Sequence, residues 1–305
     1  MGVTTHFSNK TRQFLLSVTV LLGILSKSVF GLDDITVVKP PDENDHKLDY
    51  TYEVMELALK VTEPNFGGYT LQHSAVEMVR KRQFEELATG NLLTVIISPP
   101  IPGVQKMAHR VQFPVNLGLG SYRMFFIMKE SQAILNKVTT LEELKKIPTG
   151  QGAHWTFTTV LQANNFDVVT GTNYIQLFNM LEFGRFVTFS RGINEIYQEY
   201  NTLKSKYPNL AIDNKIITFS YLPSYFYVSL KHPKIAKRLY EGLLMIHESG
   251  DLIKIFNKYH SENIERAKIP NRKLFVFDNP NVSPSMFSHD KPYLIDLGLD
   301  IESNR

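Results

Sequence analysis

An uninterrupted apolar run at residues 92–97, Leu-Leu-Thr-Val-Ile-Ile, constrains the fold most strongly. Its side chains do not alternate with polar ones, which is typical of a strand covered on both faces of a sheet. Two strand–helix pairs precede it: strand patterns at 35–38 and 69–72, and helical patterns at 49–62 and 74–87. This β-α-β-α-β order predicts a parallel sheet with crossover helices, and therefore an α/β protein.

The alternation continues through the rest of the chain. Further strands are expected at 122–128, 166–169, 185–190 and 216–230 (interrupted by Pro223), and further helices at 141–145, 155–164, 174–181, 192–206, 233–249 and 251–259. The last fifteen residues are polar and are expected to form a loose tail.

Composition excludes several classes of protein. Hydrophobic residues make up 43% and charged residues 21%, as in ordinary globular chains. Residues 1–31 carry the whole net charge of +3, so residues 32–305 are neutral overall, which disfavours nucleic-acid binding. The absence of cysteine rules out thiolate catalysis and cysteine-ligated metals, and no known catalytic motif is present. We therefore expect no enzyme activity, no cofactor and no metal.

The N-terminus resembles an export signal. Lys10 and Arg12 precede an apolar run at 14–25, which is too short to span a bilayer. Small residues at Val29 and Gly31 predict cleavage before Leu32, so that 1–31 is the signal peptide; an uncleaved anchor is the alternative. Without a cysteine to carry a lipid, the mature protein is expected in a periplasm.

Two junctions between a strand and a helix are candidates for ligand recognition. Gly152, His154 and Trp155 precede a helix, whose free backbone N–H groups can hold an anion; a tight turn is the alternative. Arg191 ends a strand at a helix start, where open α/β sheets bind ligands, so it can clamp a carboxylate or phosphate. An ordinary ion pair is the alternative for Arg191.

Four further residues complete the predicted binding site. Ser98 ends the buried strand, Tyr225 belongs to an aromatic group that lines a cleft or fills a core, and Arg110 and Arg123 flank the first crossover. If the basic groups converge with Arg191, the ligand is expected to be anionic or rich in hydrogen-bond acceptors.

The order of these segments resembles the family-3 extracellular solute-binding proteins, the polar-amino-acid type that serves ABC importers. The resemblance covers roughly 33–280 and includes the strand at 122–128, Leu141–Leu144, Gln151-Gly152, Met180–Arg185 and the run from His232 to Phe256. It implies the type II periplasmic binding fold: two lobes, each a mixed, mostly parallel sheet flanked by helices, joined by two crossover strands and closing on a small-molecule ligand.

The resemblance also implies boundaries and partners. Lobe 1 is expected at 33–127 and 223–285, lobe 2 at 128–222, and a polar tail at 286–305. The expected partners are a small-molecule ligand and an ABC permease or a membrane receptor, with the protein itself a monomer. The alternatives are a sensing module for a membrane signalling protein, and a dehydratase-like enzyme using Glu195 or His154 as acid or base.

Two departures from the family bear on the ligand. The Thr-x-x-Arg that usually holds an amino-acid carboxylate is replaced by the stretch Gln105–Arg110. Arg191 and Gly192 stand near the position of the aspartate that usually holds the ammonium group. A basic residue there would repel an ammonium ion, so the sequence predicts an anionic or neutral ligand rather than an α-amino acid.

Overall fold

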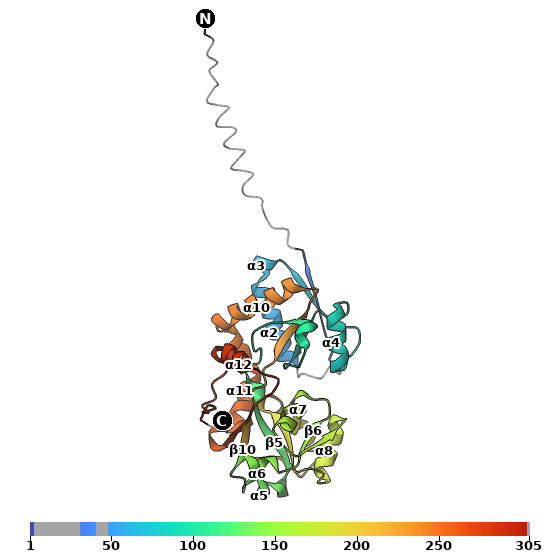
Figure 1. Cartoon of the computed structure of the whole chain (residues 1–305), viewed down its shortest axis with the longest axis vertical. Helices are drawn as coiled ribbons and strands as arrows, with labels where there is room; N and C mark the ends of the chain where they lie inside the picture. The colour runs from blue at the N-terminus through green and yellow to red at the C-terminus, as the bar shows by residue number, and fades with distance from the viewer. Residues whose placement is uncertain (3–30, 41–47, 304–305) are drawn as a thin grey trace.

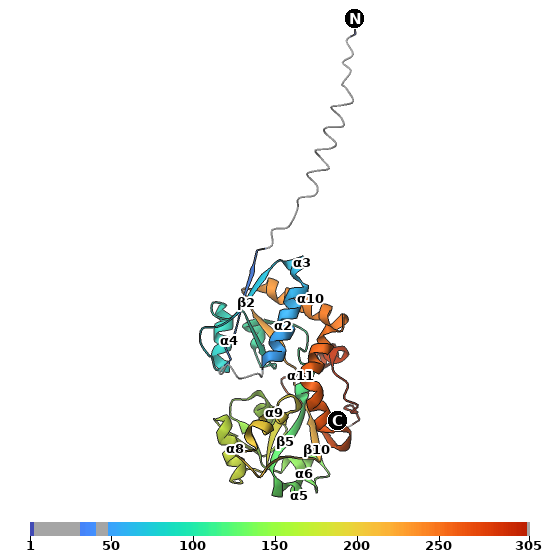
Figure 2. The same cartoon turned by 180° about the vertical axis from the view of Figure 1, so that it is seen from behind.

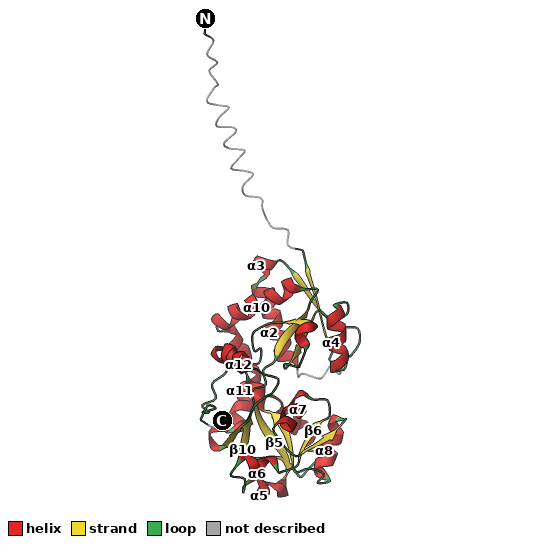
Figure 3. Ribbon diagram, viewed as in Figure 1, coloured by secondary structure: helices red, strands yellow, loops and turns green. Residues whose placement is uncertain are grey.

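The computed structural model describes residues 1–2, 31–40 and 48–303. The predicted signal peptide lies almost wholly outside these residues. The described chain forms two α/β lobes, one above the other in Figures 1 and 2. In both lobes helices lie beside the strands (Figure 3), so the predicted α/β class with sheets flanked by helices is confirmed.

The first lobe contains two small sheets. Strands β1 (Asp33–Val37) and β2 (Tyr69–His73) pair in parallel. Strand β11 (Tyr225–Ser229) lies between β3 (Val95–Ser98) and β4 (Ala108–Arg110) and is antiparallel to both. The helices of this lobe are α2 (Asp49–Val61), α3 (Glu63–Phe66), α4 (Arg80–Thr89) and α10 (Pro233–Glu248).

The second lobe is built on a seven-stranded sheet in the order β12-β10-β5-β8-β6-β7, with β9 paired to β5. Its strands are β5 (Tyr122–Met128), β6 (Thr149–Gly152), β7 (Val168–Gly171), β8 (Thr188–Gly192), β9 (Leu210–Ile212), β10 (Ile216–Phe219) and β12 (Lys273–Val276). Its helices are α5 (Gln132–Leu135), α6 (Leu141–Lys145), α7 (Thr156–Ala163), α8 (Tyr174–Glu182) and α9 (Ile193–Leu203). The sheet is mixed, because β5 runs antiparallel to β8, β9 and β10.

The chain passes between the lobes more often than the two crossovers expected from the sequence. The first crossover enters β5, and the second leaves β10 for β11. In addition, helix α11 (Asp251–Ala267) leads from the first lobe to β12, which pairs with β10 in the second sheet. The segment after β12 returns to the first lobe. The predicted boundaries placed 122–127 and 273–276 in lobe 1, whereas both segments belong to the sheet of lobe 2.

The C-terminal segment is not the loose tail that its polar composition predicts. It contains α12 (Pro284–Asp290), and Asp290 is buried. The hydroxyl of Tyr221 donates to Asp290 Oδ2 at 2.6 Å, and the hydroxyl of Tyr225 donates to the same oxygen. Farther along, the backbone N–H of Ile295 donates to the carbonyl of Leu117. A few specific residues of this polar segment thus attach it to the rest of the protein, and composition alone does not identify them.

Helices α2 and α10 form the tightest helix pair of the first lobe. Val54, Ala58 and Leu59 of α2 and Leu239 of α10 are buried in one hydrophobic cluster, and the two helices are in contact. Gly242 lies so close to α2 that an added Cβ would meet the carbonyl oxygen of Ala58 at 2.2 Å. Only a residue without a side chain fits at this crossing.

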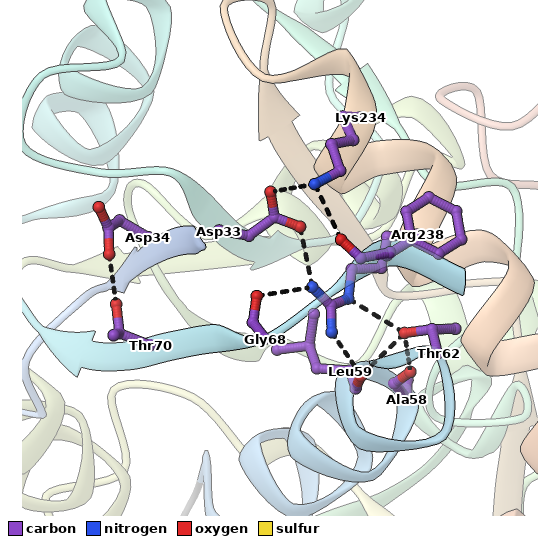
Figure 4. A network of polar contacts seen from close by, with 10 residues as sticks. Asp33, Asp34, Ala58, Leu59, Thr62, Gly68, Thr70, Lys234 and Arg238 are labelled. Atoms are coloured by element: carbon purple, nitrogen blue, oxygen red, sulfur yellow. Dashed lines mark hydrogen bonds and ion pairs between the residues drawn. The ribbon is translucent and has the colours of Figure 1, made fainter. Parts of the chain in front are cut away.

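A buried arginine ties the start of β1 to these helices (Figure 4). Arg238 of α10 donates from Nη1 to Asp33 Oδ2 at 2.8 Å, from Nε to Thr62 Oγ1 at 3.1 Å and from Nη2 to the Leu59 carbonyl at 2.9 Å. Lys234 holds the other oxygen of Asp33 at 2.9 Å. Because an unpaired buried charge is very costly, this network fixes β1 against α10.

No helix in the described part of the chain has both the length and the apolar character needed to cross a bilayer.

Candidate functional site

A cleft of about 340 Å³ lies between the two lobes and is lined from both sides. The first lobe contributes side chains from α2, α4, β3 and the loops that precede β5 and β11; the second contributes one face of α9, and α11 closes the end. The polar residues that line it are Tyr50, Thr51, Arg80, Ser98, Asn116, Asn194, Glu195, Gln198, Ser224, Tyr259, His260 and Asn263. The cleft is therefore mainly a surface of uncharged hydrogen-bonding groups.

Arg80 contributes a positive charge to this cleft. It is the first residue of α4, and its Nη1 donates to the Ile97 carbonyl at 2.6 Å and to Gln83 Oε1 at 2.9 Å. Because Ile97 belongs to β3, these bonds hold the guanidinium beside the end of that strand. The remaining N–H groups of Arg80 make no hydrogen bond with any residue that the structure describes. Because Arg80 lines the cleft, these N–H groups can donate to an acceptor bound there.

Arg191 is not one of the residues that line the cleft. Its side chain is buried, and Glu199 accepts from Nε at 2.7 Å and from Nη2 at 2.5 Å. Glu195 lies 2.8 Å from Nη2, and the ring of Trp155 lies below the guanidinium at 4.8 Å. Burial alone lowers the pKa of Arg191, but the charges of Glu195 and Glu199 outweigh it and raise the pKa. The arginine is thus satisfied by its own protein.

Arg123 is satisfied in the same way. It donates from Nε to Ser190 Oγ and from Nη2 to the Ser190 carbonyl, both at 3.1 Å, and lies over the ring of Phe157. Burial lowers the pKa of Arg123 to about 10, so the group keeps its charge at neutral pH. Glu195 is 3.8 Å away. Arg123, Arg191, Glu195 and Glu199 make a charge-balanced group, here called the Arg–Glu cluster.

The junction at Gly152 is a packing feature. An added Cβ at Gly152 would meet the ring of Trp155 at 2.4 Å, so glycine is needed for the indole to lie against this strand. The indole stacks on Phe189 at an interplanar angle of 20°. His154 is exposed and does not line the cleft. The geometry agrees with the alternative of a tight turn with a packed tryptophan.

The remaining predicted residues separate into two places. Ser98 lines the cleft, and its Oγ donates to the Pro99 carbonyl at 2.9 Å. Arg110 and Tyr225 instead line a separate cavity of about 200 Å³ beside α12, with the guanidinium 5.0 Å from the ring. The structure thus groups Gly152, Trp155, Arg123 and Arg191 inside lobe 2, whereas Ser98 alone of the predicted residues faces the cleft.

Several residues of the cleft were missed by the sequence analysis. Arg80 stands in a run of basic residues that reads as a solvated helix face. Asn194 and Gln198 are four residues apart on α9, and His260 and Asn263 are three apart on α11, so each pair shares a helix face. Uncharged amides at helical spacing carry no motif, and the predicted end of α11 at 259 stopped just before His260.

The described residues contain no group of three or more histidine, aspartate or glutamate side chains that could hold a metal ion.

Comparison with known proteins agrees on the fold. No protein-family model and no curated protein sequence matches the chain. An ancestral arginine-binding protein bound to arginine is 17% identical, with a TM-score of 0.51 over 75% of this chain and 98% of that one. A periplasmic binding protein of Salmonella typhimurium with high arginine specificity is 13% identical, with a TM-score of 0.52 over 75% and 99%.

A third solved structure is an ancestral amino-acid-binding protein described as a precursor of cyclohexadienyl dehydratase. It is 14% identical, with a TM-score of 0.50 over 75% of this chain and 96% of that one. At such low identity these similarities concern the fold. The chain therefore has the two-lobe fold of the amino-acid-type periplasmic binding proteins, as the resemblance implied.

Proposed function

We propose that this chain is a solute-binding protein that traps a small polar ligand between its lobes for an ABC-type importer. The observation that carries the proposal is the cleft, because hydrogen-bonding side chains from both lobes face one space. Closure of two lobes around a ligand at such a cleft is a common form of hinge motion. The solved structures of the same fold, described as binding arginine or glutamine, support this reading.

The sequence predicts a ligand that is anionic or rich in hydrogen-bond acceptors, and the residues that we propose to hold it differ from those predicted. That prediction relied on convergence of Arg191, Arg123 and Arg110, but the first two are neutralised or hydrogen-bonded within lobe 2 and the third lines another cavity. Among the described residues that line the cleft, Arg80 is the cation, and Glu195 brings a carboxylate into the same space. We propose a polar ligand with one strong acceptor group, such as a carboxylate or carbonyl, held by Arg80.

The geometry gives less support to an enzyme. Glu195 accepts from the Gly192 N–H at 2.9 Å and pairs with Arg191 at 2.8 Å, so its carboxylate is already engaged by groups of its own lobe. His154, the other candidate acid or base, is exposed outside the cleft. Binding without turnover is the function we propose.

A thermal-shift screen of metabolites with the purified protein tests the proposal, since a tight ligand raises the melting temperature by mass action. For a ligand that binds, we expect Arg80→Met to weaken affinity about tenfold to a hundredfold in a calorimetric titration, because a charge-assisted hydrogen bond is lost. Arg82→Met is the matched control: Arg82 lies on the same helix and pairs with Glu86. Failure of every solute to stabilise the protein would refute the function.

Export and a membrane partner belong to the same proposal. A binding protein that serves an importer must reach the outer side of the inner membrane, as the signal-like segment at 1–31 suggests. Intact-mass analysis of the exported protein should give an N-terminus at Leu32. Retention of residues 1–31 would contradict cleavage, and unimpaired uptake of the ligand in a strain lacking the protein would contradict a role in import.

A further inference from the structure

The end of the cleft formed by α9 and α11 contains four uncharged polar side chains. Asn194 and Gln198 face it from α9, and His260 and Asn263 face it from α11. None of these side chains makes a hydrogen bond with any residue that the structure describes. Helices α9 and α11 pack against each other, so the four groups belong to one wall.

His260 is the most informative member of this wall. Its side chain is only 8% exposed, and its Nδ1 is sealed from solvent without a hydrogen-bond partner in the described structure. Tyr50 packs edge-on to the imidazole at 4.7 Å, but its hydroxyl already donates to the Val115 carbonyl at 2.7 Å. Phe256 covers another side at 5.0 Å. The ring is thus enclosed by aromatic groups that offer it no hydrogen bond.

The environment of His260 sets its charge and its tautomer. Burial lowers the pKa of His260 to about 4, so the ring is neutral near pH 7. In folded proteins, a buried N–H group without an acceptor is rarer than a buried acceptor without a donor. The unpartnered Nδ1 of His260 is therefore expected to carry no proton, which places the proton of the neutral ring on Nε2. The ring therefore offers the cleft an uncharged N–H donor, beside side-chain amides that can both donate and accept.

We infer that His260, together with Asn263, Asn194 and Gln198, forms a neutral subsite that selects an uncharged hydrogen-bonding group of the ligand, such as a carboxamide or hydroxyl. This inference rests on the proposed solute-binding function. An anionic group here would lose its hydration without meeting an opposite charge from these four residues, and Glu195 of the same helix adds a carboxylate to the cleft. An uncharged polar group can replace its water hydrogen bonds one for one.

Pairs of solutes that share one carboxylate and differ in a second group, neutral or anionic, test the inference: glutamine and glutamate, asparagine and aspartate. Affinity for each is measured by calorimetry on the whole protein at pH 7. We expect the neutral member of a pair to bind more tightly. His260→Phe should weaken that member roughly three- to tenfold and reduce the preference between the two members. His260→Gln, which keeps an N–H near the position of Nε2, should restore part of the preference.

His247→Phe is the control, because His247 of α10 packs on Phe113 and is not part of the cleft. A stronger affinity for the charged members, or a preference that His260→Phe leaves intact, would overturn the subsite while the solute-binding function stands. If none of these probes binds the wild-type protein but other solutes of the screen do, the subsite is also refuted. Absence of binding to every solute refutes the function itself.

Discussion

Arg191 and Glu199 form a buried ion pair with two hydrogen bonds, Nε to Oε2 at 2.7 Å and Nη2 to Oε1 at 2.5 Å. The pair connects the end of β8 to the helix that follows it. Glu195, one helical turn earlier, binds the same guanidinium at 2.8 Å. Arg191 thus fixes the orientation of α9, the helix that supplies one wall of the cleft.

Arg191→Ala is therefore expected to destabilise the protein with or without ligand. Removing one partner of a buried pair leaves a carboxylate without compensation and typically costs about 3–5 kcal/mol of unfolding free energy. Urea denaturation at pH 7 measures the change. Lys254→Ala, which breaks an exposed pair with Asp251, should change the unfolding free energy little. If Arg191→Ala instead leaves the stability unchanged and abolishes ligand binding, Arg191 binds the ligand directly, as the sequence predicted.

The sequence allowed the regular elements to be predicted better than the site. Residues 122–128 are apolar except for Arg123 and form β5 over the predicted range. Strand β12 was missed because it is only four residues long and its partner β10 lies far away in sequence. A short strand that is stabilised by pairing with a distant segment shows no clear hydrophobic pattern in its own sequence.

The site was harder to predict because a charged residue in the sequence does not show whether it will pair with a ligand or with another residue of the protein. Arg191 was expected to hold a ligand, although Glu195 and Glu199 follow at spacings that return to the same helix face. That spacing was the available signal for an internal ion pair. By contrast, nothing in the sequence around His260 shows that a cleft reaches α11, because the cleft depends on how the two lobes are placed.

Gly242→Ala tests the contact between α2 and α10. The added Cβ would meet the Ala58 carbonyl oxygen at 2.2 Å, and backbone cannot move aside as a flexible side chain can. Overpacking of this kind costs about 1–3 kcal/mol, which outweighs the gain in helix propensity from replacing glycine. Thermal denaturation should show the loss. Met245→Ala, at an exposed position of the same helix, is the control and should change stability little.

Tyr225→Phe tests the attachment of the C-terminal segment. The substitution removes one of the two phenol donors to the buried carboxylate of Asp290 and should cost about 1–3 kcal/mol. Limited proteolysis should then cut within 284–303 sooner than in the wild type. Tyr200→Phe is the control, since the hydroxyl of Tyr200 makes no hydrogen bond with the described residues. Equal protease resistance in the two variants would mean that Asp290 does not hold this segment.

The buried imidazole of His260 predicts a particular dependence of stability on pH. Burial lowers the folded-state pKa to about 4 from the ordinary value of 6.5. Between these pH values His260 binds a proton in the unfolded chain but not in the folded protein. The unfolding free energy therefore falls as the pH drops from about 6.5 to 4, by up to about 3 kcal/mol from this group.

His260→Phe isolates this contribution, because the phenyl ring can keep the aromatic contacts with Tyr50 and Phe256 but cannot titrate. Urea denaturation of both proteins at several pH values gives the difference in unfolding free energy. We expect that difference to be constant above pH 7 and to move in favour of the variant as the pH falls toward 4. Carboxylates that titrate in the same range affect both proteins alike and cancel. Parallel curves over the whole range would show that His260 is protonated as readily in the folded protein as in the unfolded chain.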